Sequence, residues 1–239
     1  MESGFTSSPN GVRASPHDAA ELLRLEQVRL AYDQVTTSQL VAVLNAVVFV
    51  AVQCLVIAPP VLVGWLSAVC LLALVRIAGG AAFRRAAPQP AEIERWRTYV
   101  IAGAAASGIV WGSTAVFLFP PMNIAHQVFV AFMVGGMVAG SMTTLGPVFP
   151  AFATFAILAL VPVVIRFTSQ HDAVSYAMGW MALVFLVAVI VIAHRSQRGL
   201  SDMLLLRIQN ARLVGEVLAM QGRLARLQEE AEALRRGGR

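Results

Sequence analysis

The sequence contains no lysine and few charged residues of any kind. All 18 basic residues are arginines, and charged residues make up 13% of the 239 residues, against about 25% in an ordinary soluble domain. Hydrophobic residues make up 58%, and the mean hydropathy is +0.71. This composition indicates an integral membrane protein. The arginines form no basic patch, so the pI of about 10.2 does not indicate a nucleic-acid partner.

Cysteine is also scarce. Cys54 and Cys70 both lie in apolar stretches, where cysteine behaves as a small hydrophobe. Two cysteines are too few for a disulfide framework, and we expect neither a disulfide, a bound metal nor another cofactor. The segment 1–16 is polar and lacks the apolar core of a signal peptide. We therefore expect the first apolar helix to remain in the membrane as an uncleaved anchor.

Six apolar stretches are long enough to cross a bilayer, which takes about 20 residues. The boundary between the fourth and fifth stretches depends on Gly146-Pro147 and Pro150. The sequence predicts an all-α membrane domain over residues 38–194, preceded by a cytoplasmic segment over residues 1–37. The predicted spans are residues 39–58, 61–83, 98–119, 127–145, 149–167 and 174–193.

Arginines flank the predicted spans on one side. They precede the first span, separate the second from the third and follow the sixth, whereas the turns on the other side contain none. Cytoplasmic loops carry the excess of positive charge, so we expect both termini in the cytoplasm. Arginine as the only basic residue, together with abundant alanine, is typical of a GC-rich bacterial genome. We therefore expect a multi-pass protein of a bacterial inner membrane.

Residues 18–33 predict a helix before the first span. Leu22, Leu25, Val28 and Tyr32 share one side of it. We expect this amphipathic helix to lie on the inner leaflet, and packing against the C-terminal helix is the alternative.

The predicted spans contain no acidic residue. Their two arginines, Arg76 and Arg166, are placed toward span ends. Carriers coupled to ions usually place ionisable groups at mid-membrane, so this pattern disfavours a pump or a coupled transporter. The same pattern does not exclude an uncoupled carrier as the function of the protein.

Two glycine pairs with a spacing of four residues predict close helix packing. Gly108 and Gly112 lie in the third span, and Gly136 and Gly140 lie in the fourth. We expect packing within the chain, with a dimer interface as the alternative. Pro162 removes one backbone hydrogen bond from the fifth span and can kink it.

Three residues of the outer turns belong to types that bind metals. These are His126, His171 and Asp172. Their spacing matches no metal motif, so we expect solvated surface residues there.

The last forty residues carry an apolar repeat with a period of seven. Such a repeat keeps one edge of a helix against a partner, so residues 195–236 predict a parallel coiled coil. Asn210 falls at a core position, where asparagine fixes the register at a cost in stability. We call the following set the seam: Met203, Leu206, Asn210, Leu213, Val217, Met220, Leu224, Leu227, Ala231 and Leu234.

Several segments resemble the N-terminal sensor regions of bacterial membrane histidine kinases and diguanylate cyclases, which are MASE-like input modules. They are Trp111-Gly112, the run from Gly135 to Gly140, Leu160-Val161-Pro162 and the run from Leu206 to Asn210. The resemblance implies a dimeric input module that controls an attached or partner enzyme.

The sequence departs from complete members of those families in one respect. It has neither a His-Glu-Leu-Arg phosphoacceptor motif nor a cyclase signature, so no catalytic residue can be assigned. We therefore expect a non-catalytic homodimer in the lipid bilayer, with the output domain absent from this sequence. The alternatives are a channel or uncoupled carrier for a small hydrophobic solute, and a membrane scaffold that docks a partner through the coiled coil.

Overall fold

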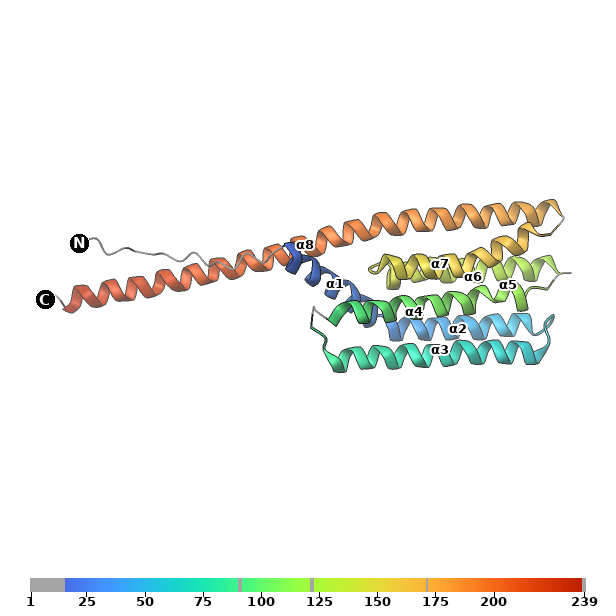
Figure 1. The fold of residues 1–239 in the computed structure, drawn as a ribbon, viewed down its shortest axis with the longest axis horizontal. Coiled ribbons are helices and arrows are strands. Elements are labelled where there is room, and N and C mark those ends of the chain that lie inside the picture. Colours follow the sequence, from blue (N-terminus) through green and yellow to red (C-terminus); the bar gives the residue numbers. More distant parts are fainter. Residues whose placement is uncertain (1–15, 90–91, 121–122, 171, 238–239) are drawn as a thin grey trace. The chain divides into compact units, whose positions relative to one another are not determined.

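The computed structural model describes residues 16–89, 92–120, 123–170 and 172–237. Contacts divide the chain into two units, Met1–Arg198 and Gly199–Arg239. Within the described ranges the secondary structure is helical and contains no strand (Figure 1). The helices are α1 Pro16–Asp33, α2 Val35–Gln53, α3 Pro59–Ala86, α4 Ile93–Gly112, α5 Thr114–Phe117, α6 Ile124–Leu145, α7 Phe149–Thr168 and α8 Ala173–Gly237.

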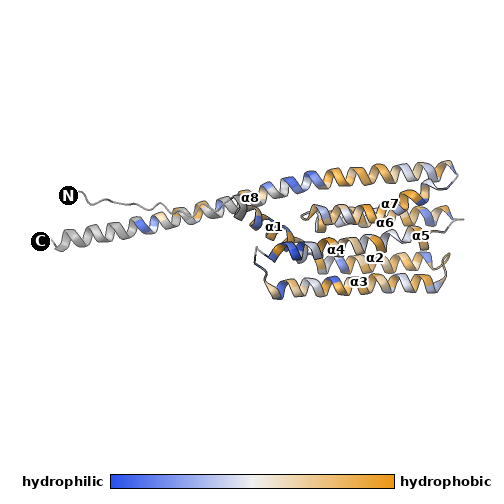
Figure 2. Cartoon of the chain, in the orientation of Figure 1, coloured by the Kyte–Doolittle hydropathy of each residue, from blue (hydrophilic) through white to orange (hydrophobic). Residues whose placement is uncertain are grey.

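Six helical segments of the described chain are long and apolar enough to cross a membrane. The predictions of an all-helical structure and of six helices long and apolar enough to span a membrane are thus confirmed, and hydrophobic residues dominate these helices (Figure 2). The uncertain boundary between the fourth and fifth spans falls in the short connection between α6 and α7. The six segments are Val35–Gln53, Pro59–Ala86, Ile93–Phe117, Ile124–Leu145, Phe149–Thr168 and Ala173–Gly199.

The third span differs from its prediction because it is interrupted. The span was expected to be one helix, but α4 ends at Gly112 and a single turn, α5, follows Ser113. The hydroxyls of Ser113 and Thr114 donate to the carbonyl oxygens of Val110 and Trp111, at 2.7 and 2.6 Å. Hydroxyls that bond to nearby backbone carbonyls bend helices, which accounts for a break at this point.

The helices α4 and α7 are in extensive contact, and the first glycine pair allows their close approach. A Cβ atom built on Gly108 would lie 2.8 Å from Leu158 Cβ and 2.9 Å from the Phe155 carbonyl oxygen. A Cβ on Gly112 would collide with the Leu158 carbonyl oxygen and lie 3.2 Å from Pro162 Cγ. This pair therefore packs within the chain, against the backbone of α7, and α7 continues as a helix through Pro162.

Helix α1 packs against one end of the span helices. Val28 is fully buried and Tyr32 is nearly so, which places the predicted apolar side of this helix against protein. The Tyr32 ring stacks on Phe83 of α3 with centroids 4.3 Å apart, and its hydroxyl donates to the Trp96 carbonyl oxygen of α4 at 3.3 Å. Burial raises the pKa of the Tyr32 hydroxyl to about 12. The sequence predicts that α1 lies on the inner leaflet or packs against the C-terminal helix. Neither prediction includes these contacts with α3 and α4.

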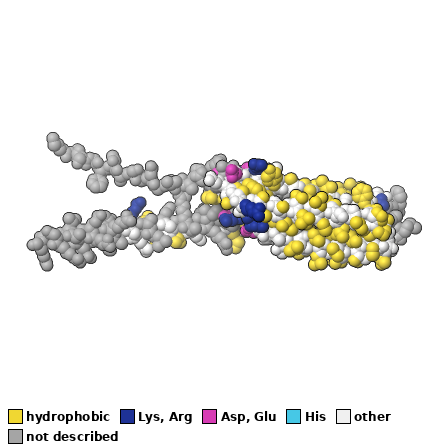
Figure 3. All heavy atoms as spheres, turned by 90° about the horizontal axis from the view of Figure 1, so that it is seen from below, with side chains coloured by type: hydrophobic (Ala, Val, Ile, Leu, Met, Phe, Trp, Pro, Cys, Tyr) yellow, Lys and Arg dark blue, Asp and Glu magenta, His cyan; other side chains and the backbone are white. Residues whose placement is uncertain are grey.

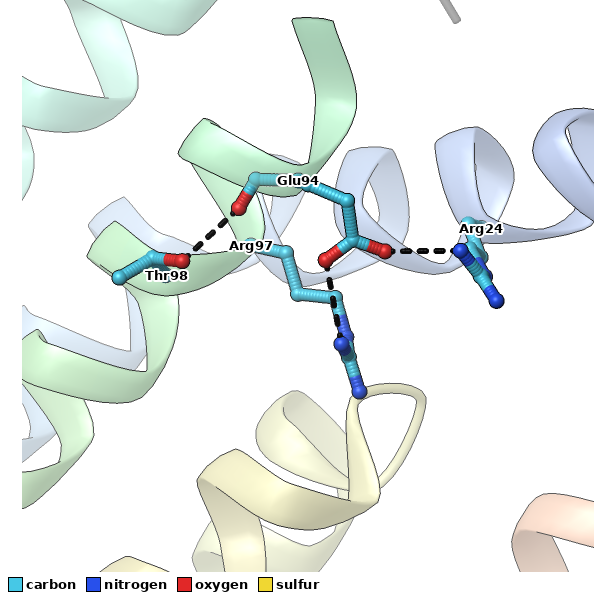
Figure 4. A network of polar contacts seen from close by, with 4 residues as sticks. All are labelled: Arg24, Glu94, Arg97 and Thr98. Carbon is cyan, nitrogen blue, oxygen red and sulfur yellow. Dashed lines mark hydrogen bonds and ion pairs between the residues drawn. The ribbon is translucent and has the colours of Figure 1, made fainter. Parts of the chain in front are cut away.

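A short ion-pair network joins α1 to the start of α4. The Glu94 carboxylate accepts from Arg24 at 2.9 Å and from Arg97 at 3.2 Å, while its carbonyl oxygen accepts from the Thr98 hydroxyl (Figure 4). Both partners of the Arg24–Glu94 pair are about half exposed, so the pair contributes about 1 kcal/mol at most. Charged side chains gather at this end of the hydrophobic block (Figure 3).

The Tyr32 ring, rather than its hydroxyl, should stabilise the docking of α1. We expect Tyr32→Phe to lower the free energy of unfolding by about 1 kcal/mol or less, because it removes one long hydrogen bond. Tyr32→Ala should cost about 3–5 kcal/mol, because it empties the space between Phe83 and Trp96. Thermal unfolding of the detergent-solubilised variants measures the difference. Equal effects of the two changes would contradict this account.

The second unit presents the apolar seam as exposed side chains. Met203, Leu206, Leu213, Val217 and Met220 are between 53% and 66% exposed, and Asn210 is exposed as well. The side chains of Leu224, Leu227, Ala231 and Leu234 lie outside the described residues.

Candidate functional site

A cavity of about 530 Å³ lies within the first unit, between the span helices. Its walls come from α2, α3, α4, α6 and α7. The side chains combine an apolar wall with hydroxyls, amides, one arginine and, at one end, the Asp33 carboxylate. The principal lining residues are Thr37, Ser38, Gln39, Val41, Asn45, Val69, Leu72, Arg76, Ser107, Val110, Trp111, Gly136, Met137, Gly140, Ser141, Thr143, Thr144 and Phe155.

Arg76 is held in this cavity by two small residues of α4. Its Nη1 donates to the Ser107 hydroxyl at 3.0 Å, and that hydroxyl donates to the Gly103 carbonyl oxygen at 2.9 Å. A Cβ on Gly103 would lie 3.4 Å from Arg76 Nε, so the glycine leaves room for the guanidinium to lie along α4. Gly103 and Ser107 are one helical turn apart and together form a niche for the side chain.

Arg76 lies one helical turn before Gly80, which packs beside Val35 at the start of the first span. Helix α3 continues for ten residues beyond it, to Ala86, which corresponds to about 15 Å of helix. Arg84 and Arg85 lie in the last turn of α3, two turns beyond Arg76. Arg76 therefore lies about one helical turn inside the level at which α2 begins.

This arginine is not paired with an acid in the described part of the chain. None of the ion pairs found there includes Arg76, and Ser107 is its hydrogen-bond acceptor. A guanidinium carries five N–H donors, so most of its hydrogen-bonding capacity is free for another group. A charge inside a membrane domain is costly unless it is paired, and such residues mark functional sites.

The second glycine pair borders the cavity. A Cβ on Gly136 or Gly140 would meet no atom within 4 Å, and both residues are exposed on α6. They therefore do not mediate the close packing that the first pair makes. Together with the half-exposed Val41 of α2, they leave the cavity open on the side between α2 and α6.

Two aromatic side chains close the inner wall. Trp111 is 3% exposed and packs edge-to-face on Trp65, with centroids 5.3 Å apart. The Trp65 indole donates to the Val110 carbonyl oxygen at 2.9 Å, which fixes the position of that ring. Phe155 of α7 is also buried and lines the same cavity. This wall is rigid and apolar, and it suits an apolar part of a ligand.

A second cavity of about 640 Å³ lies on the other side of Arg76. It is bounded by α1, α3 and α4, and its lining includes Tyr32, Trp96 and Tyr99. Arg76 lines both cavities, so a change at this side chain alters both of them.

The predicted outer-turn residues do not gather at this site. The His126 Nδ1 atom lies 2.6 Å from Gln53 Oε1, and Gln53 Nε2 donates to the Leu118 carbonyl oxygen at 3.0 Å. His126 is thus a half-buried partner of Gln53 rather than a solvated residue. Asp172 accepts from the Ser175 backbone at the start of α8, and hydrogen bonds from Ser175 lower its pKa.

No metal centre is found among the described residues, where no three histidine, cysteine, aspartate or glutamate side chains gather. His171 lies outside the described residues. Cys54 and Cys70 are both free thiols.

The comparisons with known proteins give no relative from which residues could be assigned. The sequence matches no protein-family model, and searches of curated proteins and of solved structures find no match. The features of the chain that bear on its function are therefore the cavity, Arg76 and the seam.

Proposed function

We propose that this chain is the dimeric membrane input module of a bacterial signalling protein, with both termini in the cytoplasm. The observation that carries the proposal is the exposed seam on α8, where side chains from Met203 to Met220 follow a heptad spacing. Water-exposed apolar side chains at that spacing are stable when a second helix covers them. A second copy of the chain supplies an identical stripe, in register at Asn210.

The continuity of α8 provides a route for a signal. This helix begins at Ala173, inside the last span, and includes the whole seam. Packed helix interfaces adopt discrete arrangements, so a shift or rotation of the span can select between two arrangements of the seam. The resemblance to sensor histidine kinases and diguanylate cyclases favours an output of that kind, joined to the module or recruited by it.

A chimera tests the proposal through the phase of the seam. The chain is fused after α8 to a cyclase domain that is active as a dimer, with zero to seven residues inserted in the helix at the junction. We expect activity to rise and fall with helical phase and to return near seven added residues, because the seam then regains its orientation. The matched control breaks the seam with Leu206→Asp and Leu213→Asp. Activity that is indifferent to both insertion and seam would contradict the proposal.

The cavity beside Arg76 favours a second candidate, an uncoupled carrier for a small hydrophobic solute. The predicted spans contain no acidic residue, which disfavours a coupled carrier but not an uncoupled one. Flux measurements in liposomes separate the candidates: specific solute flux that persists in the seam-broken variant favours the carrier.

A further inference from the structure

We propose that the cavity beside Arg76 binds a lipophilic monocarboxylate, a molecule with one carboxylate head group and one apolar tail such as a single-chain fatty acid. The proposal names a ligand for the input module and rests on that proposed function for its signalling role. The binding itself depends on the cavity alone and is measured separately.

The charge of the site selects the head group. Arg76 lines the cavity, is not in an ion pair among the described residues, and donates to the neutral hydroxyl of Ser107. A guanidinium in a low-dielectric site needs a counter-ion, and its planar fork matches a carboxylate in a bidentate pair. One carboxylate neutralises one arginine, so the ligand carries a single negative charge.

The walls select the rest of the molecule. Val69, Leu72, Val110, Trp111 and Phe155 supply an apolar wall next to the guanidinium. The volume of about 530 Å³ lies within the usual range of about 300–1,000 Å³ for small-molecule sites. A carboxylate of a few atoms leaves most of this space for an apolar chain.

The opening of the cavity selects the route of entry. Its lateral side, between α2 and α6, is bordered by Val41, Gly136 and Gly140, which are exposed and belong to two span helices. Its other end is lined by polar residues and by the Asp33 carboxylate, which repels an anion arriving from water. A lipophilic acid enters from the bilayer, places its head at Arg76 and leaves its tail along the two glycines.

Equilibrium binding to the full chain in lipid nanodiscs tests the proposal. A radiolabelled single-chain fatty acid should bind saturably. The matched fatty alcohol lacks the charge, so its affinity should be lower by a factor of about ten or more. Arg76→Gln should weaken fatty-acid binding by a similar factor and leave alcohol binding unchanged. The matched control is Arg166→Gln, which removes the second arginine of the predicted spans, does not line the cavity and should leave both affinities unchanged.

A second pair of variants tests the binding site without changing Arg76, so the result does not depend on whether the Arg76→Gln variant folds. Gly140→Leu should abolish binding by filling the open side of the cavity, because a Cβ there meets no atom within 4 Å. Gly64→Leu is its control, since Gly64 is an exposed glycine of α3 that also meets no atom within 4 Å and does not line the cavity.

Several results would overturn the inference. They are the absence of saturable binding, equal affinity for the acid and the alcohol, full affinity in the Arg76→Gln or Gly140→Leu variant, and equal competition by formate, which has the head group without the tail. Nanodiscs of anionic phospholipid distinguish the source of the head group: complete block of the site by that lipid would assign it to a two-chain phospholipid and overturn the single-chain ligand.

The seam-broken chain separates this inference from the proposed function. Leu206→Asp with Leu213→Asp should retain fatty-acid binding, because neither residue lines the cavity. Binding that persists while the fatty acid leaves the output of the cyclase chimera unchanged would refute the signalling role and leave the ligand site intact.

Discussion

A chain carrying Leu206→Asp and Leu213→Asp is expected to purify as a monomer, whereas the unaltered chain purifies as a dimer. Both leucines occupy the seam and are exposed in the single chain, so the partner helix must cover them. A dimer of this variant would bury four aspartates, two from each chain, and each unpaired charge costs several kcal/mol. Light scattering after size exclusion in mild detergent, corrected for bound detergent, measures the change.

Gly222→Asp is the matched control for the seam. It introduces the same carboxylate on the outward side of the same helix, where a Cβ meets no atom within 4 Å. We expect this variant to remain a dimer. A monomeric control, or a dimeric double variant, would mean that the seam does not hold the two copies together.

A Gly112→Ala substitution is expected to destabilise the membrane unit by roughly 1–3 kcal/mol. The added Cβ would collide with the Leu158 carbonyl oxygen, which belongs to the backbone of α7 and cannot rotate away. On intrinsic propensity alone, alanine would stabilise a helix by about 1 kcal/mol relative to glycine, so the sign of the effect reports the helix contact. Thermal unfolding in detergent measures it.

The matched control is Gly136→Ala, the same substitution in another span helix. A Cβ at Gly136 meets nothing within 4 Å, so we expect a neutral or slightly stabilising effect, up to about 1 kcal/mol. If both variants were equally destabilised, the close approach of α4 and α7 at Gly112 would not be a determinant of stability.

The number and composition of the span helices follow directly from the sequence, because a run of apolar residues fixes a membrane helix without reference to its neighbours. The interruption at Ser113 does not follow in the same way. The residues 98–119 read as one apolar run, and the break depends on which carbonyl oxygens the Ser113 and Thr114 hydroxyls reach.

The partners of the helices were harder to predict, because helix packing depends on side chains far apart in sequence. The two glycine pairs look alike in the sequence, yet one is packed against the α7 backbone and the other borders a cavity. Tyr32 was placed on the apolar side of an amphipathic helix, but its stacking on Phe83 could not be read from periodicity.

Arg76 shows most clearly what the sequence left undecided. The predicted span of residues 61–83 ends seven residues after Arg76, whereas α3 extends from Pro59 to Ala86 and continues for ten residues after it. Gly103 and Ser107, which surround the Arg76 side chain, belong to another helix. In the sequence they are only two small residues one turn apart, so the contact with Arg76 cannot be predicted from it.

A cysteine scan of the seam in native membranes tests the central claim, the parallel pairing of two copies. In a background with Cys54→Ala and Cys70→Ala, single cysteines are placed along residues 203–223 and oxidised. The account predicts strong disulfide formation between identical residues at seam positions such as Leu206 and Leu213, and little at Gly215 and Gly222, because only a parallel, in-register pair brings each core residue beside its own copy. Crosslinking that shows no seven-residue period, or no crosslinking at any seam position, would contradict it.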